Sequence, residues 1–107
     1  MMLKTEFQNL LEDINQSIDV ILFTRKGEKI FEPEFGCGIW ELLDRGIEQV
    51  PVLIASVYDA LNKWEKRIRV DKVKINSFEP NTGQVSIEIY YTMRNNNERG
   101  IYRGNLS

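Results

Sequence analysis

The fold is decided by residues 85–94, which read VSIEIYYTMR. Apolar side chains occupy every second position of this stretch, from Val85 to Met93, and more polar ones alternate with them. Because successive side chains of a strand point to opposite faces of a sheet, this period of two predicts a strand with one buried face. We place the strand at 84–94 and expect Ile87 and Ile89 in the core.

Two further strands are predicted on either side of this one. Residues 69–77 also alternate, with a change of phase near Asp71 that indicates a β-bulge. The sequence EPNTG at 79–83 predicts a turn, and three asparagines at 95–97 predict a polar loop before a third strand at 100–106. We therefore expect the C-terminal part of the chain to form an antiparallel sheet of three strands.

The residues before this sheet have helical periodicity instead. Between Leu3 and Phe23 the apolar residues are spaced by three and four positions, which predicts one amphipathic helix. The residues of this stripe are Phe7, Leu10, Leu11, Ile14, Ile18, Ile21 and Leu22. The stripe is regular enough for a helix bundle, formed either within the chain or with another chain.

A second main helix is predicted at 52–66, where Pro51 suits the first turn. Ile54, Val57 and Leu61 line one face of this helix and are expected in the core. A short helix is predicted at 39–43. Because the helices precede the strands, we expect an α+β fold in a single domain of residues 1–107, with N-terminal helices packed on a small antiparallel three-stranded C-terminal sheet.

Composition limits the chemistry that this chain can perform. It has 107 residues, a net charge of −2, no histidine and one cysteine, Cys37. Without histidine, a Ser–His or Cys–His catalytic pair is impossible and the commonest metal ligand is missing, so we expect no metal and no cofactor. One cysteine suits a reducing compartment. The first residues lack the pattern of a signal peptide, and no apolar run approaches the roughly 20 residues of a membrane span, so we expect a cytoplasmic protein.

A cluster of basic residues lies between the second main helix and the first strand. Its members are Lys63, Lys66, Arg67, Arg69, Lys72 and Lys74, against the two acids Glu65 and Asp71. Such a cluster can be a solvated helix end, a contact for an acidic protein surface or a contact for nucleic acid. Because no aromatic-interleaved motif and no glycine-rich loop accompanies it, we predict no nucleic-acid partner.

The segment 24–38 differs in composition from the helices on either side of it. Gly27, Pro33 and Gly36 are turn-forming residues, and Phe35 offers an apolar anchor next to Glu34. We predict an ordered structural loop in which Phe35 packs beneath the helices. Gly36 is expected to take a backbone conformation that is costly for other residues.

Two motifs resemble those of the baseplate-wedge and sheath-initiator family of contractile phage tails. The loop has the family's order of Thr24, a basic residue, Gly27, a charged residue and then the sequence PEFG at 33–36. The sequence EKRI at 65–68 occupies the place of the family's Glu-Pro-Arg-Ile motif, with Lys66 in place of the proline. The resemblance covers nearly the whole chain from about Leu10.

This resemblance implies a structural role in a contractile injection system, which is a phage tail, a type VI secretion system or a phage-tail-like particle. The N-terminal helix and the segment Glu65-Lys66-Arg67 would bind larger wedge proteins. The C-terminal strands would bind the tail sheath protein by strand exchange and so nucleate the sheath. Glu65 and Arg67 are expected to be partly exposed in the isolated domain and to add little to its stability.

Some members of that family carry a lysozyme label, so a peptidoglycan hydrolase is the alternative function. Glu32 and Glu34 flank Pro33, and paired carboxylates hydrolyse glycosides when they face each other across a cleft. In a chain with 16 acidic residues, neighbours of this kind are expected by chance. We therefore predict that the protein is not an enzyme.

Overall fold

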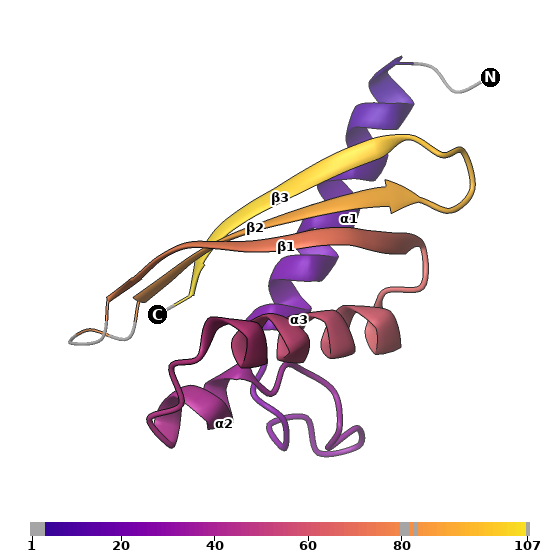
Figure 1. The fold of residues 1–107 in the computed structure, drawn as a ribbon. Helices are drawn as coiled ribbons and strands as arrows, with labels where there is room; N and C mark the ends of the chain where they lie inside the picture. Colours follow the sequence, from indigo (N-terminus) through magenta and orange to yellow (C-terminus); the bar gives the residue numbers. More distant parts are fainter. Residues whose placement is uncertain (1–3, 80–81, 83, 107) are drawn as a thin grey trace.

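In the part of the chain that the structure describes, three antiparallel strands form one sheet in the order β1-β2-β3 and three helices precede them, which confirms the predicted α+β fold (Figure 1). This computed structural model describes residues 4–79, 82 and 84–106. The elements are α1 (Lys4–Phe23), α2 (Ile39–Asp44), α3 (Val50–Trp64), β1 (Ile68–Glu79), β2 (Gln84–Met93) and β3 (Arg99–Leu106).

The alternation in β2 builds the core face of the sheet. Val85, Ile87, Ile89, Tyr91 and Met93 are buried, and most of the residues between them are half-buried. The predicted bulge is confirmed, because the register between β1 and β2 shifts between Val70 and Lys72. A second shift follows between Ile75 and Ser77. The turn predicted at 79–83 lies largely outside the described residues.

Two helices cover the inner face of the sheet. α1 packs against β3 and α3, and α3 packs against β1. Figure 1 shows α1 passing behind the strands and α3 lying below β1. The C-terminal half of the α1 stripe enters the protein's own core through Ile14, Ile18, Ile21 and Leu22, whereas Phe7, Leu10 and Leu11 are only partly buried.

The helix α3 begins and ends two residues earlier than predicted. Val57 and Leu61 are buried as expected, but Ile54 is only partly buried and Leu53 takes its place in the core. The predicted core position of Ile54 was therefore wrong. A spacing of three and four defines a stripe, but the neighbouring elements decide which edge of that stripe is fully covered.

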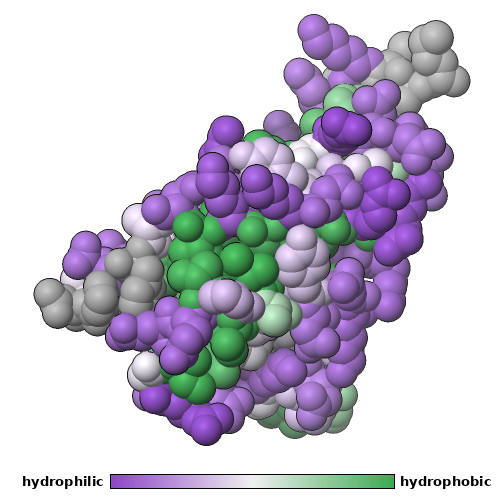
Figure 2. Space-filling view, viewed as in Figure 1, coloured by the Kyte–Doolittle hydropathy of each residue, from purple (hydrophilic) through white to green (hydrophobic). Residues whose placement is uncertain are grey.

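The loop after α1 packs on the other side of α3. Thr24 to Gly38 returns on itself, so that Arg25 and Cys37 form a parallel bridge, and the indole Nε1 of Trp40 donates to the carbonyl of Leu22 at 2.7 Å. This bond satisfies a carbonyl group at the C-terminus of α1 that has no partner within the helix. Figure 2 shows hydrophobic residues reaching the surface in a band between the strands and α3.

Candidate functional site

The segment after α3 folds back on itself through a buried carboxylate. Glu65 caps α3 in an extended conformation (φ −119°, ψ 90°), and its side chain is 4% exposed. Its Oε1 accepts hydrogen bonds from the backbone N–H of Arg67 at 3.1 Å and from Nε of Arg67 at 2.9 Å. Its Oε2 accepts a third bond from the same guanidinium at 2.8 Å. The two motif charges therefore pair with each other in a bidentate arrangement.

The same guanidinium also reaches α1. Nη1 of Arg67 donates to Oδ2 of Asp13 at 2.6 Å, and the hydroxyl of Ser17 hydrogen-bonds to Glu65. Asp13 and Ser17 are one helical turn apart on the polar face of α1. The Glu65–Arg67–Asp13 network thus joins α1 to the connection between α3 and β1. Sequence reasoning missed both α1 residues, although their i, i+4 spacing on one polar face was a usable signal.

Electrostatics keep this network ionised. Burial by itself would raise the pKa of Glu65, but hydrogen bonds from Arg67 and Ser17 and the charge of Arg67 lower it below its ordinary value. Hydrogen bonds to Glu65 and Asp13 raise the pKa of Arg67 in turn. The expectation that both motif charges are partly exposed was wrong for Glu65. It holds for Arg67, whose side chain is 40% exposed.

Lys66, the residue that departs from the family motif, points away from the network. It is exposed, and its Nζ donates to the carbonyl of Asn62 at 2.8 Å. Among the residues that the structure describes, no backbone carbonyl accepts a hydrogen bond from the Lys66 N–H. Proline, which has no backbone N–H, would therefore lose no backbone hydrogen bond at position 66.

A groove runs beside the network along α1. It has a volume of about 300 Å³ and is lined by Asp13, Gln16, Ser17, Val20, Ile21, Phe35 and Trp64. The indole Nε1 of Trp64 is buried and has no hydrogen-bond partner within the described part of the chain. Three features of the sequence thus meet at one place on the surface: the segment Glu65–Arg67, the loop at 24–38 and α1.

The predicted structural loop reaches this groove through Phe35. The ring of Phe35 packs edge-on against Trp64 with centroids 5.0 Å apart, and the N–H of Gly27 donates to the carbonyl of Pro33 at 2.8 Å. Gly36 has φ +119°, and a Cβ at this position would overlap the carbonyl oxygen of Thr24. Only glycine fits such a close approach at positive φ.

Two tyrosine hydroxyls fix α1 to the sheet. Tyr91 donates to Oδ1 of Asn15 at 2.7 Å, and Tyr102 donates to Oδ1 of Asp19 at 2.7 Å. Gly100 leaves the space that the Tyr91 ring occupies, because a Cβ there would collide with the ring. These bonds hold α1 in one orientation across β2 and β3, which also positions Asp13 opposite Arg67.

The carboxylates considered for hydrolysis are not arranged as a catalytic pair. Glu32 and Glu34 are exposed, and Glu32 pairs with Lys29 at 2.9 Å. Two further acids that follow in the sequence, Glu41 and Asp44, line a separate pocket of about 220 Å³, where Asp44 forms an exposed ion pair with Arg25 at 2.7 Å.

In the described part of the chain, the cysteine is not placed as a reactive nucleophile and the acidic residues form no metal site. Cys37 is 1% exposed, and its burial raises the pKa of the thiol, which favours the unreactive protonated form. Across residues 4–79, 82 and 84–106, no group of three or more His, Cys, Asp or Glu side chains could hold a metal ion. In the same part of the chain, no helix has the length and hydrophobicity of a membrane span.

Comparison with known proteins gives two matches. The sequence profile described as Baseplate wedge protein gp25 matches residues 8–98. The crystal structure of a Geobacter sulfurreducens protein designated as a candidate tail lysozyme is similar over 100% of this chain and 96% of its own, with 32% sequence identity and a TM-score of 0.74. No curated protein sequence matches the chain. The profile includes both the loop and the segment Glu65–Arg67.

Proposed function

The chain belongs to the Baseplate wedge protein gp25 family, and on this premise we propose that it joins larger wedge proteins to the first ring of the sheath in a contractile injection system. The family implies a structural role in the baseplate of a contractile tail. The match across residues 8–98 carries the proposal, because that range contains most of α1, the Glu65–Arg67–Asp13 network and the strands β1 and β2.

The contact with wedge proteins is assigned to α1 and the network beside it. Phe7, Leu10 and Leu11 are only partly buried within this chain, so the N-terminal half of the stripe can pack on another helix. The groove along α1 is lined by Val20, Phe35 and Trp64, on which an apolar side chain of a partner can pack. A partner bound there would also cover the exposed side of Arg67.

The contact with the sheath protein is assigned to the strands. β2 is central, so β1 and β3 each have one edge that pairs with no other strand in the described residues. The unpaired N–H and C=O groups of such an edge can accept a strand of another chain. The strong alternation of β2 keeps the sheet in one register while a further strand is added.

Hydrogen exchange during assembly tests this proposal. We expect the chain to co-purify with the wedge and sheath proteins of the same contractile system, and the amides of β1 or β3 to exchange more slowly once the sheath protein is bound. Amides of α2 serve as the internal control. Normal sheathed particles in a strain without this chain would contradict the proposal.

Peptidoglycan hydrolysis is the competing function, because the similar Geobacter sulfurreducens protein carries a lysozyme designation. Glu65, Asp71 and Glu88 all have pKa values lowered below the ordinary value, which is unfavourable for a general acid. We expect no cell-wall clearance by the purified protein. Clearance by the wild type that is lost in the Glu32→Gln, Glu34→Gln double variant would establish the hydrolase instead.

A further inference from the structure

The face of the sheet that points away from the helices, here called the outer face, has a regular arrangement of charge. The strand register places three cross-strand rows on it: Arg69–Thr92–Arg99, Lys72–Tyr90–Ile101 and Lys74–Glu88–Arg103. Five of these nine side chains are cationic, and all five lie on the two edge strands. The central strand contributes Thr92, Tyr90 and Glu88.

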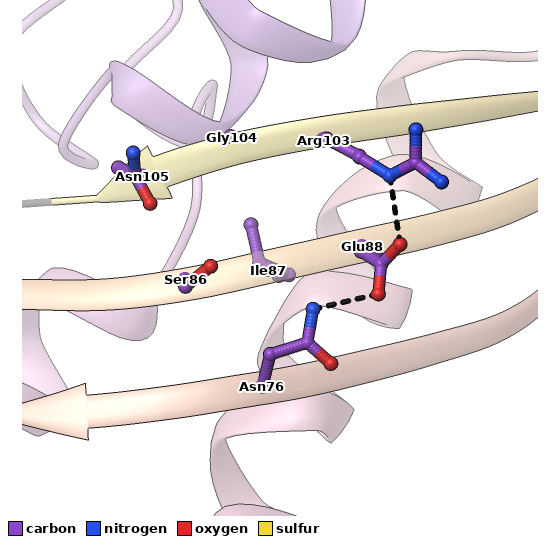
Figure 3. A pocket seen from close by; sticks show the side chains of 7 residues that line it. All are labelled: Asn76, Ser86, Ile87, Glu88, Arg103, Gly104 and Asn105. Atoms are coloured by element: carbon purple, nitrogen blue, oxygen red, sulfur yellow. Dashed lines mark hydrogen bonds and ion pairs between the residues drawn. The ribbon is translucent and has the colours of Figure 1, made fainter.

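Two of the acids on this face, Glu88 and Asp71, already accept hydrogen bonds from neighbouring side chains. Glu88 accepts hydrogen bonds from Asn76 at 2.6 Å and from Arg103 at 2.8 Å, and Figure 3 shows its carboxylate held between them. Asp71, in the bulge of β1, accepts from Thr92 at 2.5 Å and from Arg69 at 3.0 Å. These bonds lower the pKa values of both carboxyl groups, so both stay ionised near neutral pH.

The remaining cations of the three rows form no close ion pair within the described part of the chain. Lys72, Lys74 and Arg99 take part in no salt bridge among the described residues. Five cations and three acids, the third being Glu79 opposite Gln84, give the outer face a charge of +2, although the whole chain has a net charge of −2. The remainder of the chain therefore has a charge of −4. This separation of charge favours an anionic partner on one face of the sheet.

The centre of the outer face is less polar than its rim. Tyr90 and Ile101 are paired across β2 and β3 and are half-buried. A hollow of about 320 Å³ is lined by Glu88, Arg103 and Gly104 on the same two strands (Figure 3). An aromatic and an aliphatic side chain surrounded by charged ones is the usual composition of a protein–protein contact, with a central anchor and a polar rim.

We propose that the outer face binds an acidic protein segment, with carboxylates at Lys72, Lys74 and Arg99 and an apolar side chain over Tyr90 and Ile101. This contact goes beyond the proposed function, because it uses neither the Glu65–Arg67–Asp13 network nor the backbone of a strand edge. A protein segment is favoured over nucleic acid because the cations are divided between two edges around a partly apolar centre. A phosphate backbone would favour a continuous track of cations.

An NMR titration of the purified chain tests this contact. The probe is a peptide of ten glutamates, and a ten-base-pair DNA duplex at the same salt concentration tests the nucleic-acid alternative. We expect the peptide to shift the amide resonances of β1 and β3 around Lys72 and Arg99. The double variant Lys72→Gln, Lys74→Gln should weaken peptide binding about tenfold, as expected for the loss of two partly solvated ion pairs.

The matched control is Lys4→Gln, Lys26→Gln, which makes the same change of charge at two exposed lysines away from the outer face. It should leave peptide affinity within about twofold of the wild type. Equal losses in both double variants, or shifts outside the outer face, would overturn the proposal. Tighter binding of the duplex than of the peptide at this face would assign it to nucleic acid instead. Failure here leaves the wedge and sheath contacts unaffected, since these are measured by co-purification.

Discussion

The guanidinium of Arg67 lies 2.6 Å from the carboxylate of Asp13, although 54 positions of sequence separate the two residues. Arg67 also holds the buried carboxylate of Glu65, so one side chain joins the first helix to the turn before the first strand. The motif that the sequence assigns to partner binding therefore also stabilises the domain itself.

Replacing Arg67 with Ala should lower the stability of the isolated chain. The change leaves the Glu65 carboxylate buried without its cation, and we expect a loss of roughly 2–3 kcal/mol in the free energy of unfolding. Urea denaturation measures it. This outcome replaces the expectation, drawn from the sequence, that Glu65 and Arg67 add little to the stability of the isolated domain.

Asp13→Asn is the control for the Arg67 variant. The side chain of Asp13 is 64% exposed, so its ion pair is screened by water and should contribute less than about 1 kcal/mol. If Arg67→Ala costs no more than Asp13→Asn, Glu65 does not depend on Arg67 in the folded chain.

Acid should weaken the fold through Glu65. The folded-state pKa of Glu65 is lower than its ordinary value of 4.5, so its contribution is fully present above about pH 4.5 and is lost as pH falls through the lower folded value. Glu65→Gln cannot titrate at this position. The difference in melting temperature between wild type and Glu65→Gln should therefore shrink from about pH 6 to about pH 2. A constant difference over this range would contradict the assignment.

Gly36→Ala should destabilise the loop more than Gly27→Ala. Both glycines have positive φ, but only at position 36 would a Cβ overlap backbone atoms, those of Thr24. We expect about 2–4 kcal/mol for Gly36→Ala and about 1 kcal/mol for Gly27→Ala, measured by chemical denaturation. Equal costs would mean that the loop can shift away from Thr24.

Lys66→Pro, which restores the proline of the family motif, should be neutral or stabilising by up to about 1 kcal/mol. Glu65 is already in the extended region that a following proline requires, and the Lys66 N–H donates to no backbone carbonyl of the described residues. Lys66→Ala controls for loss of the side chain. A large loss of stability in the proline variant alone would show that the backbone at position 66 cannot accept the ring.

Leu61→Ala should cost about 2–5 kcal/mol, because Leu61 is fully buried between α3 and the sheet. Ile54→Ala, at a partly buried position of the same helix, should cost less. Thermal unfolding followed by circular dichroism compares the two. An equal loss would mean that Ile54 is as well covered as Leu61.

The sequence predicted most of the fold because its periodicities are strong. The alternation from Val85 to Met93 located the central strand, and the change of phase near Asp71 correctly indicated a bulge. The end of α3 was missed by two residues because Glu65 and Lys66 have no strong preference against a helix. The turn there is imposed by the pairing of Glu65 with Arg67.

The sequence by itself determined the order and type of the elements, the inward face of β2 and the need for glycine in the loop. These features depend on local backbone geometry and on hydrophobic periodicity, which are properties of neighbouring residues. Only the tertiary structure decided that Glu65 is buried, that Asp13 completes its network and that five cations share one face of the sheet. Those facts depend on how distant segments pack and on the register of paired strands, and no local pattern encodes either of them.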